Sequence, residues 1–211
     1  MGFRSAAVNL HMRRTETHPH PGPPLEGEGA GPGPLEAEGA RPDPLEVEEA
    51  QHEVLRLRDI HFADAATLLA RYGLRLERVA DEAPIPGSYW GESEAGIIGT
   101  TVYARSDTPV HSLLHEACHL VVLPPERRAA VHTDATDSIE EEDAVCLLQA
   151  LLGDLLPGVG RTRVLADMDA WGYTFRLGSA AAYFEHDADN AWAWLVERGL
   201  VAADRTLRLP D

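Results

Sequence analysis

Hydrophobic side chains recur every three or four residues in two consecutive stretches near the middle of the chain, at 110–121 and 138–153. This spacing places the apolar side chains on one face of a helix. The first stretch ends at Pro124, and the second begins at Ser138, a residue type that caps helix N-termini. The pattern therefore predicts two helices joined by a connection rich in charged residues.

A run rich in β-branched residues, Gly96–Ala104, precedes the first helix and predicts a strand. The alternation between Leu74 and Val79 predicts a shorter strand, which follows a helical pattern over 54–72. Weaker helical patterns occupy the C-terminal third, near 162–171, 179–186 and 188–198. Together these segments predict an α+β fold with a short sheet and a helical C-terminal part.

Residues 23–50 repeat with a period of ten. Each repeat contains Pro-Leu-Glu and a second glutamate two positions later, starting at Pro24, Pro34 and Pro44. One leucine in each repeat, surrounded by proline, glycine and glutamate, buries too little apolar surface to offset the entropy of ordering. We therefore predict that residues 1–50 are a disordered low-complexity segment and that residues 51–211 form one domain.

Composition narrows the classes of function. The 211 residues include 35 acidic and 18 basic ones, a formal net charge of −17, which repels phosphate backbones and anionic membranes. No apolar run approaches the roughly 18 residues of a membrane span. We therefore expect neither a nucleic-acid partner nor a membrane partner. All the basic residues are arginine, as is typical of a GC-rich bacterial genome.

Two cysteines, Cys118 and Cys146, lie in apolar helical patterns, where a free cysteine usually behaves as a small buried hydrophobe. The first dozen residues lack the apolar core of about 7–15 residues that a signal peptide needs. We therefore expect a cytoplasmic protein. Nothing in the sequence indicates its oligomeric state.

The residues that indicate chemistry are His115-Glu116-Ala117-Cys118-His119, an H-E-x-x-H sequence on the first predicted helix. Positions four apart differ by about 40° around a helix and by about 6 Å along it, so the imidazoles of His115 and His119 can reach one metal ion. Glu116 lies about 60° from His119 on the other side, where its carboxylate can approach a metal-bound water as a general base. Buried unpaired imidazoles would be costly in an apolar helix, which favours a metal site.

A third ligand is expected from the acidic cluster at 140–143, which starts the second helix. At 100° per residue, the centre of the apolar face lies about 35° from Glu141, about 65° from Glu140 and about 135° from Glu142. This geometry favours Glu141 as the ligand and assigns Glu142 to a solvated first turn that the helix dipole stabilises. Glu140, Glu142 and His132 stay open as alternatives.

An H-E-x-x-H sequence followed by a glutamate on the next helix resembles the glutamate-type zincin metallopeptidases. Among compact bacterial members, the chain is similar to the ImmA/IrrE family of metalloendopeptidases, whose E-x-E-A segment has a counterpart in Glu141–Ala144. The resemblance covers roughly residues 95–155. Within this range the sequence differs from the family pattern at Cys118 and Asp143. The resemblance implies a zincin-like core, a Zn²⁺ cofactor, and a peptide or protein substrate that pairs with the strand at 97–104.

Four further residues are candidates for supporting roles. Asp137 is placed to orient a ligand imidazole through its second nitrogen. His132, Tyr173 and Arg176 are candidates for stabilising the oxyanion of a tetrahedral intermediate. A surface position for His132 and structural roles for the other two are the competing interpretations.

The sequence thus predicts a zinc-dependent metallopeptidase that hydrolyses peptide bonds with a metal-activated water and Glu116 as general base. The alternative is a non-catalytic zinc-binding or protein-interaction module with a structural or degenerate metal site. A fourth protein ligand, such as His132, would favour the alternative, whereas an open coordination position would favour catalysis.

Overall fold

The computed structural model describes residues 53–89, 91, 93–133, 135 and 138–210. Within them, a small mixed sheet and a larger set of helices confirm the predicted α+β class. None of the helices among these residues is long and apolar enough to cross a membrane. The predicted disorder of residues 1–50 and the site residue Asp137 lie outside the described residues.

The sheet has three strands, β1 (Arg75–Arg78), β2 (Gly96–Ile98) and β3 (Thr101–Ala104), in the order β1-β3-β2. β3 pairs in parallel with β1 and antiparallel with β2. The prediction of one strand over 96–104 is therefore wrong, because the chain reverses within it. Gly99 has a φ of 60°, a conformation that glycine adopts without steric cost, and it forms the tight turn between β2 and β3.

Both sides of this hairpin are occupied by backbone hydrogen bonds. β3 lies between the other two strands. The outer side of β2 is bonded to a neighbouring loop: the amide of Thr133 donates to the carbonyl of Ile97 (3.0 Å), and the amide of Gly99 donates to the carbonyl of Val131 (2.8 Å). The expectation that 97–104 offers a free edge to an extended peptide is therefore wrong.

The helices follow the predicted order with shifted boundaries. The segment predicted as a helix over 54–72 is a short 3-10 turn (Leu57–Asp59) followed by α1 (Phe62–Arg71). The remaining helices are α2 (Val110–Val122), α3 (Pro125–Arg128), α4 (Ile139–Gly153), α5 (Arg161–Trp171), α6 (Ala180–His186) and α7 (Asp189–Glu197).

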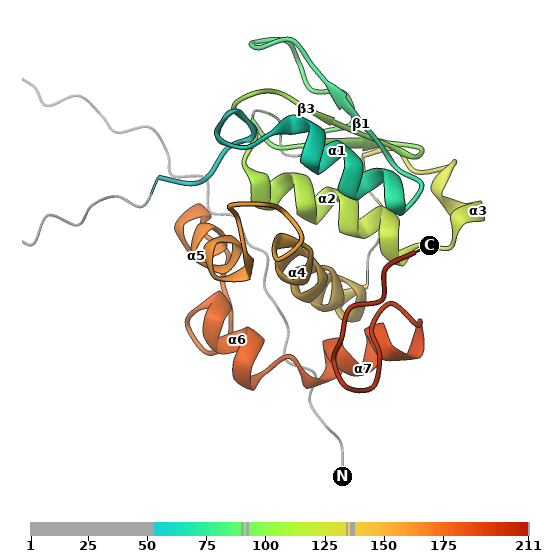
Figure 1. The fold of residues 1–211 in the computed structure, drawn as a ribbon, viewed down its shortest axis with the longest axis vertical. Coiled ribbons are helices and arrows are strands. Elements are labelled where there is room, and N and C mark those ends of the chain that lie inside the picture. Colours follow the sequence, from blue (N-terminus) through green and yellow to red (C-terminus); the bar gives the residue numbers. More distant parts are fainter. Residues whose placement is uncertain (1–52, 90, 92, 134, 136–137, 211) are drawn as a thin grey trace, which may run out of the picture. The chain divides into compact units, whose positions relative to one another are not determined.

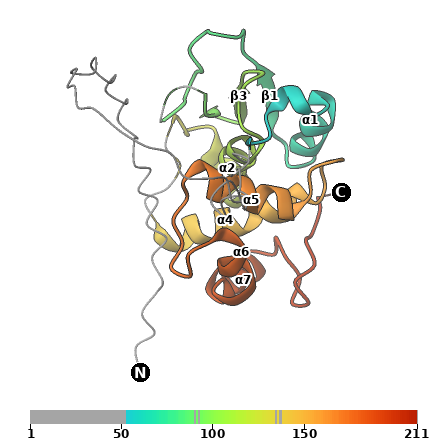
Figure 2. The same ribbon diagram turned by 90° about the vertical axis from the view of Figure 1, so that its left-hand side faces the viewer.

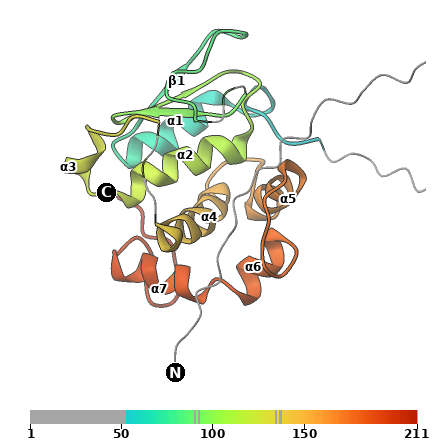
Figure 3. The same ribbon diagram turned by 180° about the vertical axis from the view of Figure 1, so that it is seen from behind.

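These elements stack in layers, as Figure 1 shows: the sheet and α1 lie on one side, followed by α2, then α4, then α6 and α7. The view from behind in Figure 3 places α2 and α4 next to each other between the sheet and the C-terminal helices. Leu113, Leu114 and Leu120 of α2 are fully buried. The two helices that carry the H-E-x-x-H sequence and the acidic cluster thus form the centre of the core.

α4 is enclosed by other helices. Figure 2 shows α5 crossing close to α4 and α2, and α7 packs on α4 as well. Every residue of α4 from Asp143 to Gly153 is buried. The helix begins as predicted at Ser138, whose hydroxyl accepts a hydrogen bond from the amide of Glu141 (3.3 Å), so only its first turn reaches the surface.

The C-terminal end of α2 is held by an arginine from the following short helix. The guanidinium of Arg128 donates to the backbone carbonyls of Leu123 (3.1 Å), Val121 (3.3 Å) and Tyr72 (2.7 Å). Carbonyls in the last turn of a helix lack partners within the helix, and a cation there also interacts favourably with the helix dipole. Arg128 therefore fixes α2 one turn beyond His119.

Candidate metal centre

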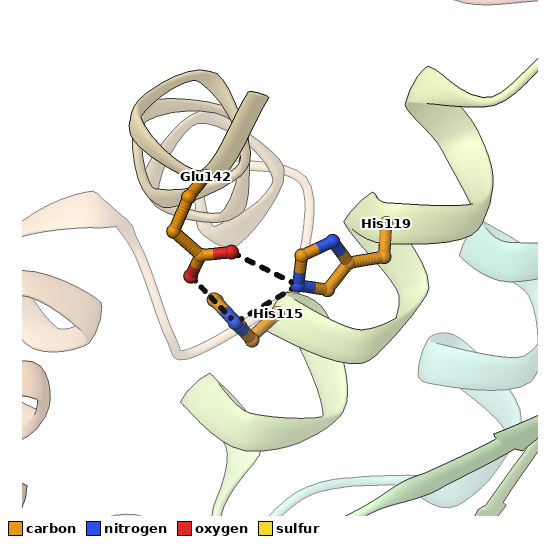
Figure 4. A group of neighbouring side chains, drawn as sticks. All are labelled: His115, His119 and Glu142. Carbon is orange, nitrogen blue, oxygen red and sulfur yellow. Dashed lines mark hydrogen bonds and ion pairs between the residues drawn. The ribbon is translucent and has the colours of Figure 1, made fainter. Parts of the chain in front are cut away.

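His115 and His119 point from one face of α2 toward α4 (Figure 4). Both side chains are buried, and their Nε2 atoms lie 3.2 Å apart. Their rings are perpendicular, with centroids separated by 4.7 Å. The spacing of four residues thus brings the two ring nitrogens together, as expected from helix geometry.

The third member of the group is Glu142, not Glu141. The Glu142 carboxylate places Oε1 at 3.2 Å from Nε2 of His115 and Oε2 at 3.4 Å from Nε2 of His119 (Figure 4). These three residues form the one group of potential metal ligands found among the described residues. The preference for Glu141 is therefore corrected, and the alternative Glu142 takes its place.

The error in choosing Glu141 has a physical cause. α4 is buried on all sides after its first turn, so the centre of its apolar face does not indicate where α2 lies. The side that faces α2 carries polar residues at helical spacing: Glu142, Cys146 and Gln149. Glu141, one position earlier, lies about 100° around the helix and lines a cavity beside α7 instead.

Gln149 is a site residue that the sequence interpretation missed. Its Oε1 lies 2.7 Å from Nδ1 of His115, and both side chains are buried. An Nδ1–H that donates to this oxygen leaves the Nε2 lone pair of His115 free to face the other two ligands. A polar residue in the otherwise apolar stretch from Ala144 to Leu152 was the signal in the sequence.

The charges of the three residues depend on one another. Burial raises the pKa of Glu142, but the neighbouring imidazoles of His115 and His119 outweigh it and bring the pKa to about 2. Burial and the nearby His115 lower the pKa of His119 to about 4. Burial also opposes protonation of His115, yet Tyr173, Glu142 and Cys146 raise its pKa well above the usual value. The low pKa values of Glu142 and His119 favour the deprotonated forms of both groups, which are the forms that bind a metal cation.

The geometry fits a bound divalent ion. Ligand atoms about 2.0–2.1 Å from a tetrahedral metal lie about 3.4 Å from one another. The two Nε2 atoms lie 3.2 Å apart, and each has one Glu142 oxygen at a similar distance, 3.2 Å for His115 and 3.4 Å for His119. Within the described part of the chain, Nδ1 of His119 and Nε2 of Gln149 are buried without a hydrogen-bond partner. Such groups are rare in folded proteins, and these two belong to a ligand histidine and to the glutamine that contacts the other one.

An aromatic wall closes one side of the centre. The ring of Tyr173 lies edge-on to His115, with centroids 6.0 Å apart, and also to His111 at 5.6 Å. Trp171 contacts His111 at 5.4 Å and donates from Nε1 to the buried carboxylate of Glu94 (2.9 Å). Burial raises the pKa of Glu94 above its ordinary value. Besides Glu142, a second buried carboxyl group, of reduced acidity, therefore lies next to these aromatic residues.

The other candidate residues are distributed unevenly. Glu116 is half-buried on α2, next to His115. His132 is exposed, and its Nδ1 lies 2.9 Å from the Thr133 hydroxyl, outside the ligand group. Arg176 forms an ion pair with Asp187. Its guanidinium is engaged by the carboxylate of Asp187, the residue that follows α6, and its role as an oxyanion donor stays a prediction.

Comparisons with protein-family models, with curated proteins and with solved structures find no match to this chain.

Proposed function

We propose that this protein is a zinc-dependent peptidase in which His115, His119 and Glu142 hold the metal and Glu116 acts as general base. The observation that carries the proposal is the close approach of the two imidazoles and one carboxylate: the Nε2 atoms lie 3.2 Å apart, and Oε1 and Oε2 of Glu142 lie 3.2 Å and 3.4 Å from Nε2 of His115 and of His119, respectively. A glutamate directly after the first ligand histidine is the residue that metal-dependent peptidases with an H-E-x-x-H helix use as a base. The resemblance of the sequence to zincins agrees with this assignment.

The donor set favours zinc over harder cations. Two imidazoles and one carboxylate suit Zn²⁺, whereas Mg²⁺ and Ca²⁺ prefer sites made of oxygen ligands. Catalytic zinc sites usually have three protein ligands and leave one position to water or substrate. Three ligand side chains meet among the described residues, and His132, the fourth ligand considered from the sequence, is not one of them. This supports catalysis over a structural metal.

When bound, the zinc ion would supply Lewis acidity, lowering the pKa of water and polarising the substrate carbonyl. Glu116 would accept the proton of the attacking water and pass it to the leaving amine. Tyr173 would donate a hydrogen bond to the carbonyl oxygen as negative charge develops there. Burial raises the pKa of Tyr173, so its phenol keeps its proton at neutral pH.

The proposal is tested by metal analysis and peptide hydrolysis on the full-length protein. We expect about one equivalent of zinc per chain and cleavage of peptides from a fluorogenic library. Glu116→Gln should retain the zinc and lose at least about 100-fold in hydrolysis, within the range typical of general-base removal. Glu126→Gln, which changes an exposed glutamate of α3, is the matched control and should behave as wild type.

Two results would overturn the proposal. Purified protein without zinc that also fails to bind added zinc would remove the metal centre. Zinc-loaded protein that cleaves no peptide in the library, or cleaves equally well with Gln at position 116, would leave a metal-binding module without peptidase activity.

A further inference from the structure

A cavity of about 410 Å³ lies between the end of α2, the short helix α3, the first turn of α4 and the segment after α7. Its apolar lining includes Val122, Leu123 and Leu200. These side chains offer a surface for an aliphatic group, because burying apolar area is favourable.

The same cavity is lined by three arginines, Arg127, Arg128 and Arg198. This concentration of positive charge is unusual in a chain with 35 acidic and only 18 basic residues. One carboxylate, Glu141, also lines the cavity, so three positive charges face one negative charge.

Two of these arginines have no carboxylate partner within the described residues. Arg128 donates only to the carbonyls of Tyr72, Val121 and Leu123, and burial lowers its pKa. The Arg127 side chain makes no hydrogen bond or ion pair with the described part of the chain. The third, Arg198, stacks on the ring of Trp194 at 3.3 Å and lies 3.9 Å from Glu197.

The cavity and the metal centre share two helices. Val122 follows His119 by three residues on α2, less than one helical turn of about 5.4 Å. Glu141 directly precedes the ligand Glu142 on α4. The cavity and the metal centre therefore involve neighbouring positions of the same two helices.

We propose that this cavity is a substrate subsite that receives a carboxylate carried by an aliphatic peptide segment. The inference rests on the proposed function, because it treats the cavity as part of a peptidase cleft. Guanidinium groups bind carboxylates with paired hydrogen bonds, and the valine and leucine side chains cover the neighbouring aliphatic residue. The carboxylate comes either from a glutamate side chain or from the C-terminus of the peptide.

Three labelled peptides separate these sources: Ala-Leu-Glu-Leu-Ala amide, Ala-Leu-Gln-Leu-Ala amide, and Ala-Leu-Gln-Leu-Ala with a free C-terminus. Fluorescence anisotropy measures their binding to the full chain carrying Glu116→Gln, which prevents turnover. We expect at least one of the two acidic peptides to bind about tenfold or more tightly than the neutral amide. Tighter binding of the first assigns a side-chain carboxylate, and tighter binding of the third assigns a C-terminus.

The variant Arg127→Gln/Arg198→Gln should remove this preference, while Arg128 stays in place to hold α2. Arg75→Gln changes an exposed arginine of β1 that pairs with Glu77 and serves as the matched control. It should leave the preference unchanged. The preferred peptide should also lose affinity as salt is raised, because charge attraction is screened.

The subsite is refuted if the three peptides bind alike, if none binds the protein at about 1 mM, or if the preference survives the double arginine variant. These outcomes are distinct from failure of the proposed function. Zinc-dependent cleavage without selectivity for acidic peptides would retain the peptidase and remove the subsite. Arginine-dependent binding of an acidic peptide by a protein that holds no zinc would retain an acidic-peptide site and remove the peptidase.

Discussion

Gln149 lies seven residues after Glu142 on α4, and its Oε1 is 2.7 Å from Nδ1 of His115. The same helix face therefore provides a metal ligand and the group that orients another ligand. His119 has no such support among the described residues, since its Nδ1 is buried without a partner. His115 is therefore the ligand imidazole that a buried hydrogen bond orients.

Replacing Gln149 with Met should weaken zinc binding by about 10- to 100-fold, because the hydrogen bond that orients His115 is lost while the volume is nearly kept. Gln149→Glu keeps an acceptor and should restore most of the affinity. Competition with a chelating dye measures both dissociation constants. Equal zinc affinities in wild type and Gln149→Met would show that Gln149 does not position the ligand.

Glu142→Gln should reduce zinc affinity by more than about 100-fold, beyond the range seen for residues that only support a ligand. Glu141→Gln is the matched control, since its side chain lines the neighbouring cavity, and it should retain zinc. Isothermal titration of metal-free protein compares the two. If Glu141→Gln lost zinc and Glu142→Gln retained it, Glu141 would be the third ligand.

Zinc should stabilise the folded protein because the three ligands come together only after folding. At a free zinc concentration of about 100 times the dissociation constant, the gain is about 2.7 kcal/mol, or roughly 5–10 °C in melting temperature for a domain of this size. Differential scanning calorimetry with and without zinc measures it. His119→Ala should abolish the shift, whereas His132→Ala, which changes an exposed histidine, should keep it.

The buried His111 should make the protein less stable in acid. Its pKa is lowered to about 3, first by burial and then by the neighbouring His115, while an unfolded histidine titrates near 6.5. Between these values the unfolded state binds the additional proton, so the free energy of unfolding falls as the pH decreases. The contribution of His111 is fully present above pH 6.5 and is lost progressively toward pH 3.

The variant His111→Phe should therefore show a weaker pH dependence than wild type. The difference in slope is about 1.4 kcal/mol per pH unit between pH 6.5 and 4. Urea unfolding at several pH values measures it, and any constant loss from the altered packing cancels in the slope. Parallel curves for the two proteins would show that His111 does not titrate in this way.

The sequence determined the helices that surround the site, because their signals are local. Ser138 caps α4 as predicted, and α2 spans nearly all of the predicted helix before the prolines. The turn at Gly99 within the predicted strand was missed, because the β-branched residues on both sides of it form one continuous run. Local composition does not distinguish one long strand from a hairpin.

The paired imidazoles also followed from the sequence by itself, because a separation of four residues on a helix has one geometric outcome. The third ligand and the group that orients His115 did not. They depend on the rotation of α4 about its axis, and a helix buried on all sides gives no apolar stripe from which to read that rotation. Only the packing of α5 and α7 against α4 turns Glu142 and Gln149, rather than Glu141, toward the histidines.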